Sequence, residues 1–396
     1  MTGRRIATAR AAYSMAALLP LLALDSCARS TSSSRALMPT SPPAGAAVAS
    51  DTLEREPAGA GKNASQPPAQ GLALVTFGGD GGSSNLTPPH RPPPPTPPLP
   101  GPYPPIPHCP ILPADNIWNR DISRMAVHAK SATWVTSIGA SKKLYVGFAP
   151  ALFGMQYVLT GSATPKVSIT FGQDPTHSDP GPYPFTATTP LEMGTVDFHA
   201  IMIDTTTCTL YELYNANWNG GQPRADAGVV FPLTSDALRP DSWSSADEAG
   251  LPIFCGLARW DEVLAGSIHH ALRFEAAAGH IDGTLGAHLW PARHDPHGSS
   301  ASNPALPPMG ARFRLKSTYS ITGFSPHAQV ILRALQHYGM FLADIGYDWE
   351  LIGTADTRWE KSVIDELESV PASQFEVVDE TSLKITTNSA QSLTPP

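Results

Sequence analysis

Residues 197–216, "DFHAIMIDTTTCTLYELYNA", set the architecture that we expect for most of the chain. Apolar and polar side chains alternate in "DFHAIMID" (197–204) and again in "CTLYELYNA" (208–216). Alternation with a period of two is typical of β-strands, and the small polar residues between the two runs favour a turn. This stretch therefore predicts two neighbouring strands joined by a short turn.

Short runs of the same kind recur through 109–380, where Gly, Pro, Asp and Asn separate them. Helical periodicity is confined to 325–339, where Ser325 supplies an N-cap, to 356–370 and to the short stretch 244–250. We therefore expect one mainly β domain, a β-sandwich or jelly-roll with a few peripheral helices. Further strands are predicted at 167–171, 228–233, 267–276, 288–293, 312–316, 340–344 and 348–353.

The N-terminal segment has the features of an export signal. Several arginines precede the apolar run 11–24, which is too short to span a bilayer, and "LDSC" then ends at Cys27 like a bacterial lipobox. We therefore expect 1–27 to be a signal peptide with Cys27 lipidated, and an ordinary cleaved signal is the alternative. The composition of residues 28–108 predicts a disordered Ala-, Ser- and Pro-rich spacer with a polyproline tract. We expect residues 381–396 to form a flexible tail. This organisation predicts a protein that is secreted or anchored in the cell envelope.

The charge and the cysteines narrow the class of protein further. The formal net charge is −8 and no basic stripe is present, which argues against nucleic acid as a partner. Apart from Cys27 the chain has three cysteines, and two of them can form a disulfide in an oxidising compartment. Cys255 lies in the apolar run "LPIFCGL" and reads as a buried thiol, so we favour a Cys109–Cys208 bridge. We expect a monomer.

Several acidic residues lie where glycoside hydrolysis would need them. This reaction uses two carboxyl groups placed on either side of the scissile bond. Glu192, Asp197 and Glu212 occur in consecutive segments, and Asp344 follows an apolar strand. These residues are our candidates for the catalytic carboxyl groups. The candidates for stacking against sugar rings are Tyr214, Trp218, Trp290 and Trp349.

A polysaccharide lyase would need a different set of groups, namely a His or Tyr base and a cation that neutralises a uronate. The chain also offers this set. Arg273 and Arg293 equally fit structural ion pairs with nearby acids, because buried cations need partners. The candidates for the lyase chemistry are His199, His270, His294, Tyr214, Arg273 and Arg293.

The stretch "HLWPARHDPH" (288–297) combines three His with Arg, Asp and Trp. We expect its Arg293 and His294 to border the functional cleft, together with His270 and Arg273. The sequence contains no HExxH or CxxC motif and no GxSxG motif. We therefore expect no metal, no cofactor and no Ser or Cys nucleophile.

Several blocks of the chain resemble a group of secreted bacterial proteins that open with P-A-D-N-x-W-N and carry W-P-A-R-H. The resemblance covers most of 109–380. It implies a single exported domain and implies no particular activity. The blocks are "PADNIWNRDIS" (113–123), "DPGPYPF" (179–185), "HALRF" (270–274), "WPARH" (290–294), "PPMGARFRLK" (307–316) and "ILRALQHYGMFLAD" (331–344).

Two classes of function are consistent with these features. The first is a cell-surface carbohydrate-active enzyme, with glycoside hydrolase ahead of polysaccharide lyase. The second is a non-catalytic module that binds glycan or protein. A cleft lined by carboxylates favours an enzyme, whereas a shallow apolar patch favours a binding module. The expected partner is a polysaccharide, with membrane contact through a lipid anchor only.

Overall fold

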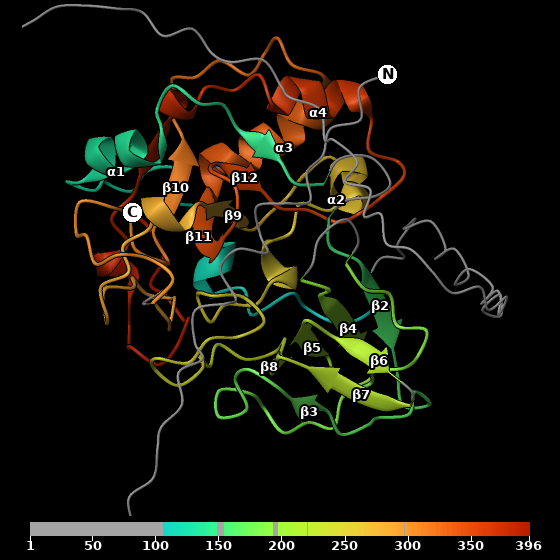
Figure 1. Ribbon diagram of the computed structural model, residues 1–396. Helices are drawn as coiled ribbons and strands as arrows, with labels where there is room; N and C mark the ends of the chain where they lie inside the picture. The colour runs from blue at the N-terminus through green and yellow to red at the C-terminus, as the bar shows by residue number, and fades with distance from the viewer. Residues whose placement is uncertain (1–105, 149–153, 193–196, 220, 297) are drawn as a thin grey trace, which may run out of the picture. The chain divides into compact units, whose positions relative to one another are not determined.

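Three β-sheets carry the fold of the computed structural model, which describes residues 106–148, 154–192, 197–219, 221–296 and 298–396 (Figure 1). These described residues belong to one compact unit. The predicted signal peptide with Cys27 and nearly all of the predicted spacer lie outside the described residues. No helix within the described ranges is long and apolar enough to cross a membrane.

The predicted pair of strands forms the centre of a four-stranded sheet. Its two strands are antiparallel, with Ile203 opposite Leu210 and Ile201 opposite Glu212, so the predicted hairpin is confirmed. A third strand pairs with one side of the hairpin in parallel, and a fourth pairs with the other side in antiparallel. In sheet order the strands are β2 (Tyr157–Thr160), β4 (Ala200–Asp204), β5 (Thr209–Tyr214) and β8 (Ala227–Pro232).

Both faces of this sheet are buried. Because successive side chains point to opposite faces, Ile201 and Ile203 lie in the main core of the protein, whereas Ala200 and Met202 lie in a second, smaller core. A three-stranded sheet contributes Ala225 to the smaller core. Its strands are β3 (Thr170–Phe171), β7 (Gln222–Ala225) and β6 (Asn217–Asn219).

A six-stranded sheet, drawn in Figure 1, contributes Phe274, Phe313 and Phe341 to the main core. Its central strands, β9 and β11, are parallel neighbours, so their carboxyl ends lie at the same edge of the sheet. In sheet order the strands are β1 (Tyr145–Val146), β12 (Glu350–Leu351), β9 (Leu272–Ala276), β11 (Met340–Ile345), β10 (Arg312–Leu315) and β13 (Phe375–Val377).

The described ranges contain four α-helices, of which α3 follows the prediction closely. The Ser325 side chain accepts a hydrogen bond from the Ala328 N–H, Pro326 opens the helix, and the helix ends shortly before Gly339. The second predicted helix is shorter than 356–370, and 244–250 forms turns and bends instead of a helix. The helices are α1 (Ser131–Ile138), α2 (Trp260–Ala265), α3 (Pro326–His337) and α4 (Lys361–Leu367).

The mainly β fold with few helices, of the β-sandwich kind, is confirmed by these sheets and helices. The prediction of a strand at 288–293 is wrong, because this segment forms a loop. The Asp295 carboxylate holds the loop by accepting hydrogen bonds from the backbone N–H groups of Gly286 (2.7 Å) and His288 (2.6 Å). Alternation of apolar and polar side chains does not reveal that a carboxylate binds the backbone in this way.

The segment after residue 380 differs from the flexible tail that we expected. The Ile117 N–H donates to the Ala390 carbonyl (2.8 Å), and the Leu238 N–H donates to the Asn388 carbonyl (3.1 Å). Leu383 and Ala390 are buried in the main core. The segment is therefore packed against the start of the domain, because it contributes both apolar side chains and backbone acceptors.

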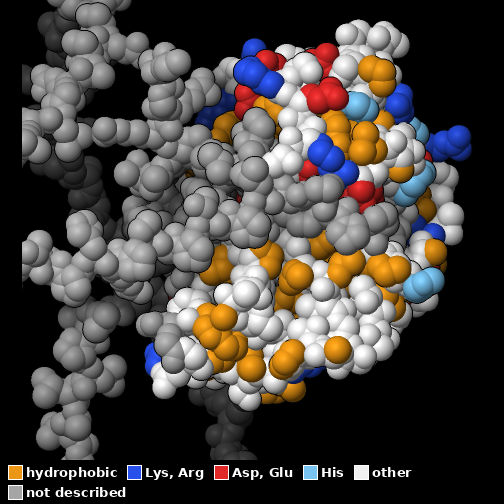
Figure 2. Space-filling view, turned by 90° about the vertical axis from the view of Figure 1, so that its right-hand side faces the viewer, with side chains coloured by type: hydrophobic (Ala, Val, Ile, Leu, Met, Phe, Trp, Pro, Cys, Tyr) orange, Lys and Arg blue, Asp and Glu red, His pale blue; other side chains and the backbone are white. Residues whose placement is uncertain are grey.

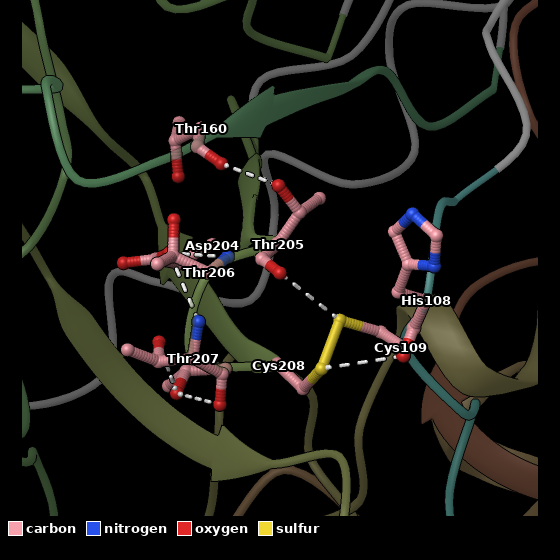
Figure 3. The surroundings of a disulfide bond; sticks show 9 residues. His108, Cys109, Thr160, Asp204, Thr205, Thr206, Thr207 and Cys208 are labelled. Atoms are coloured by element: carbon pink, nitrogen blue, oxygen red, sulfur yellow. Dashed lines mark hydrogen bonds between the residues drawn. A yellow bond between two sulfur atoms is a disulfide. The ribbon is translucent and has the colours of Figure 1, made fainter.

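The predicted disulfide between Cys109 and Cys208 is confirmed, and it joins two cysteines that are 99 residues apart (Figure 3). It lies beside the turn between β4 and β5. In that turn the Asp204 carboxylate accepts hydrogen bonds from the backbone N–H groups of Thr206 (3.0 Å) and Thr207 (3.3 Å). Cys255 is a buried free thiol, as predicted, and burial raises its pKa.

Candidate functional site

A cavity of about 380 Å³ lies where strands of two different sheets end, and we call it the acidic cavity. Its described lining includes Asp197 and His199, which precede β4, and Tyr214, which ends β5. It also includes Glu275 and Asp344, near the ends of β9 and β11. Four of the predicted site residues, Asp197, His199, Tyr214 and Asp344, therefore meet in one cavity.

The parallel pairing of β9 and β11 brings two carboxylates to the same place. Glu275 and Asp344 are register partners, and the register shifts just before Asp344. Arg273 lies two residues before Glu275 in β9, so these two side chains share a face. Like charges directly opposite each other destabilise a sheet, so this arrangement needs a nearby cation.

Arg273 supplies that cation and is fully buried beneath the acidic cavity. Its Nη2 lies 3.3 Å from Asp247 Oδ2 and 3.4 Å from Asp344 Oδ2, and its Nη1 lies 3.6 Å from Glu275 Oε1. One positive charge therefore faces three carboxyl groups. Such a group is not neutral unless protons or another cation are added.

The electrostatics of the carboxyl groups follow from this imbalance. Burial raises the pKa of Asp247, Arg273 lowers it, and the charge of Asp344 raises it again. Burial and the charge of Glu275 raise the pKa of Asp344, and Arg273 and His199 counteract only part of this effect. The pKa values of both groups therefore lie well above the ordinary value for Asp. The pair retains a proton under conditions where exposed carboxyl groups have lost theirs.

His199 is held as a cation at the wall of the acidic cavity. Its Nδ1 lies 2.5 Å from Glu192 Oε2, and its Nε2 lies 2.9 Å from the carbonyl oxygen of Ala246. Burial lowers the pKa of His199, but the Glu192 carboxylate outweighs this effect and raises the pKa to about 9. Because both ring nitrogens donate to fixed acceptors, His199 is not free to act as a base, contrary to the lyase role that we considered.

Tyr214 lies between the cation and a carboxylate. Its ring centroid is 5.4 Å from that of His199, and its hydroxyl lies 3.5 Å from Asp197 Oδ1. Burial and the charges of Asp197 and Asp344 raise the pKa of Tyr214, so the phenol stays protonated and can donate a hydrogen bond.

Glu212, another predicted catalytic carboxylate, does not line the acidic cavity. It is fully buried and accepts hydrogen bonds from the backbone N–H groups of Ile253 (3.0 Å) and Phe254 (2.8 Å). Burial raises its pKa to about 7, although the two backbone donors act in the opposite direction. The side chain positions the 253–254 backbone behind the site, which is a structural role.

Other predicted residues lie elsewhere. His270 Nε2 is 3.2 Å from Glu262 Oε2, in a buried cluster with Arg259. His294 lies behind the wall of the acidic cavity, with Nδ1 3.0 Å from the carbonyl oxygen of Glu248. Neither histidine lines the acidic cavity. Of the predicted aromatic residues, Trp349 is fully buried beside Phe274 and Trp218 packs against Phe185.

Arg293 and Trp290 line a second cavity, of about 300 Å³. The Arg293 guanidinium donates to the carbonyl oxygens of Arg239 and Thr387, each at 2.8 Å, and the Trp290 indole donates to the Ser389 carbonyl at 2.8 Å. Both side chains thus fasten the C-terminal segment to the domain. The described part of this stretch, 288–296, is mainly a scaffold loop, and Arg293 does not border the acidic cavity.

The sequence analysis missed several residues of the acidic cavity: Asp174, Asp247, Glu248, Glu275, Tyr347 and Asp348. Glu275 and Asp348 stand at the ends of predicted strands. The same position made Asp344 a candidate, so it could also have identified these two residues. Asp247 and Glu248 lie in 244–250, which we predicted as a helix. As a helix, this segment would have been placed on the periphery rather than at a site.

No group of three or more His, Cys, Asp or Glu side chains in the described ranges is arranged to hold a metal ion. Comparison of the chain with models of known families, with curated proteins and with solved structures found no match. The proposed function therefore rests on the geometry of the acidic cavity.

Proposed function

We propose that this protein is an exported glycoside hydrolase and that the acidic cavity is its active site. The observation that carries the proposal is that Asp344 and Asp197 line one cavity in different environments. Glycoside hydrolases use one carboxyl group that holds a proton and one that is ionised. The volume of about 380 Å³ is within the usual range for small-ligand sites.

Asp344 has the environment of the proton donor. Burial and the neighbouring Glu275 raise its pKa, so it keeps a proton that can be transferred to the oxygen of the leaving sugar. Asp197 is half-buried, and the Tyr214 hydroxyl and the His199 cation lie beside it. In the proposed reaction Asp197 is the second carboxyl group, which acts on the sugar or on an attacking water.

The lining supports hydrolysis over the lyase reaction. A lyase would need a cation facing the substrate to neutralise a uronate. The described lining contains no Lys or Arg, and its cationic side chain, His199, already pairs with Glu192. Arg273 lies beneath the acidic cavity and already faces three carboxyl groups. A uronate in this cavity would meet repulsion.

A non-catalytic binding module would present a flat apolar surface instead. On the face shown in Figure 2, hydrophobic side chains lie among polar and charged ones. The exposed large hydrophobic residues of the described ranges, such as Phe198 and Leu285, are single residues on different segments. This distribution favours an enclosed site over a flat platform.

The N-terminal sequence supports the location and the partners in the proposal. The leader-like segment and the lipobox at Cys27 favour export and a lipid anchor, and the proline-rich spacer would hold the domain away from the membrane. The proposed protein is monomeric, acts on a polysaccharide and uses no cofactor.

The test is incubation of the mature protein with a panel of polysaccharides. Release of reducing ends is measured together with the ultraviolet absorbance of unsaturated uronates. We expect reducing ends alone, and a loss of about 10²–10⁴-fold in kcat for Asp344→Asn, which removes the proton donor. Asp197→Asn should also abolish hydrolysis.

Asp365→Asn is the matched control, because it makes the same chemical change on the exposed surface of α4 and should leave the rate unchanged. An unsaturated product would identify a lyase, and retention on a glycan without any product would identify a binding module. Full activity in both Asp344→Asn and Asp197→Asn would overturn the assignment of the site.

A further inference from the structure

We infer that the acidic cavity selects a cationic sugar, that is, a glycan that carries free amino groups. This inference rests on the proposed function and specifies the substrate class of the same site. Seven of the described lining residues are Asp or Glu, whereas the only cationic side chain among them is His199. Charge of one sign in an enclosed site attracts ligands of the opposite charge.

The charges around the acidic cavity do not balance. His199 is neutralised by Glu192, and Arg273 is shared among three carboxyl groups. Asp348 pairs with Lys142 and His280 at the edge of the cavity, and Glu248 Oε1 lies 3.3 Å from His294 Nδ1. The three carboxyl groups around Arg273 outnumber its single positive charge, and this excess is reduced either by bound protons or by a bound cation.

Asp174 is a carboxylate that is open to a ligand. It is half-buried in the lining, and its carboxylate makes no hydrogen bond or ion pair with any described residue. It follows β3, so it faces the cavity from the three-stranded sheet, whereas Asp344 comes from the six-stranded sheet. An amino group bound between the two sides would gain acceptors from both.

The shape and chemistry of the lining favour an ammonium group on a sugar over a bare metal ion. In the described ranges no three acidic or His side chains converge as metal ligands. Tyr214 and Tyr347 contribute aromatic rings to the lining, and aromatic rings attract ammonium groups as well as the apolar faces of sugars. Carboxylates beside aromatic rings match a ring that carries an amino group.

Three oligosaccharides test the inference, because they differ only in the group on carbon 2. They are the β-1,4-linked tetramers of glucosamine, N-acetylglucosamine and glucose, which carry an amine, an acetamide and a hydroxyl. At low ionic strength and mildly acidic pH, we expect the glucosamine tetramer to bind at least about tenfold more tightly than the other two in calorimetry. Added salt should reduce this preference because it screens the charges.

Asp174→Asn keeps the size of the side chain and removes its charge. It should reduce the preference for the glucosamine tetramer several-fold, whereas Asp365→Asn on α4 should leave the preference unchanged. If the Asp174→Asn variant does not fold, the comparison of the three tetramers on the wild-type protein still tests the inference.

The outcomes separate this inference from the proposed function. If the glucose or N-acetylglucosamine tetramer binds as well as the glucosamine tetramer, or if only neutral or acidic polysaccharides are hydrolysed, the inference is overturned and the hydrolase stands. If the glucosamine tetramer binds selectively and no glycan is ever cleaved, selection of an amino sugar is supported and the hydrolase is refuted. Selective binding with release of reducing ends supports both.

Discussion

Replacement of Arg273 by Met tests the electrostatic account of the acidic cavity. Met has a similar length and no charge, so Arg273→Met leaves Asp247, Glu275 and Asp344 facing one another without a cation. Removal of one partner of a buried ion pair lowers the free energy of unfolding by about 3–5 kcal/mol. The Nε and Nη1 atoms of Arg273 have no hydrogen-bond partner among the described residues, and Nη1 makes only the 3.6 Å ion pair with Glu275, so we expect a cost at the lower end of this range.

We therefore expect Arg273→Met to lower the free energy of unfolding by about 3 kcal/mol at pH 8, or about 6 °C in melting temperature for a domain of this size. The variant raises the pKa values of Asp247 and Asp344 further above their values in the unfolded chain, because it removes the cation that lowers them. A group whose pKa is raised by folding stabilises the protein at low pH, and this contribution is lost as the pH rises through the folded-state pKa. The deficit of the variant should therefore shrink between pH 8 and pH 5.

The measurement is denaturant unfolding followed by tryptophan fluorescence at both pH values. Arg333→Met is the matched control, because Arg333 is exposed on α3 and, among the described residues, donates a hydrogen bond to the Gln329 side chain alone. The control should change stability by less than about 0.5 kcal/mol at either pH. An Arg273→Met deficit below about 1 kcal/mol at pH 8, or one that does not shrink at pH 5, would refute the charge argument.

Three other predictions follow from the contacts. The Cys109→Ser, Cys208→Ser double variant should lose about 2–4 kcal/mol of stability in denaturant unfolding, and reductant should bring the wild type to the same level. The His199–Glu192 pair should stabilise the fold fully below pH 6.5, the ordinary pKa of His, and lose this effect as the pH rises through about 9, because folding raises the pKa of His199. Melting curves of His199→Gln from pH 6 to pH 10 should lack that decline, and parallel curves would contradict the assignment. Arg293→Met should lower stability by about 2–4 kcal/mol through its lost hydrogen bonds and leave the catalytic rate of the folded protein unchanged; lost activity without lost stability would return Arg293 to the functional site.

The local patterns that the sequence predicted well are those that depend on neighbours in the chain. Alternation located β4 and β5, and the Ser325 cap with Gly339 located the two ends of α3. The disulfide followed from the apolar setting of Cys255, which left the other two cysteines to pair. Each of these predictions rests on a signal of a few residues, although the disulfide itself joins cysteines that are 99 residues apart.

The predictions that differed from the structure concern long-range contacts. They depend on which segment covers a face of a sheet and on which residue lies beside the end of a strand. Alternation places Glu212 on the same face as Leu210, but only the fold shows that the 253–254 backbone covers this face. Likewise, the meeting of Glu275 with Asp344 depends on parallel pairing of strands that are far apart in sequence. A sequence pattern gives the direction of a side chain and not its long-range neighbour.

The position of the acidic cavity follows from where a sheet tolerates unbalanced charge. Within a sheet, neighbouring strands and both cores enclose the side chains, so a charge there needs a complete set of partners, as Glu212 has. At the strand ends the cover is incomplete, and Asp344 keeps a partly exposed side chain while Arg273 neutralises only part of the charge behind it. Carboxyl groups gathered in this way reduce stability, and the large main core offsets the loss. Substitution of Asn or Gln for one of these carboxyl groups would relieve part of the repulsion, so the presence of several of them in the lining of a cavity supports a role with a ligand rather than in folding.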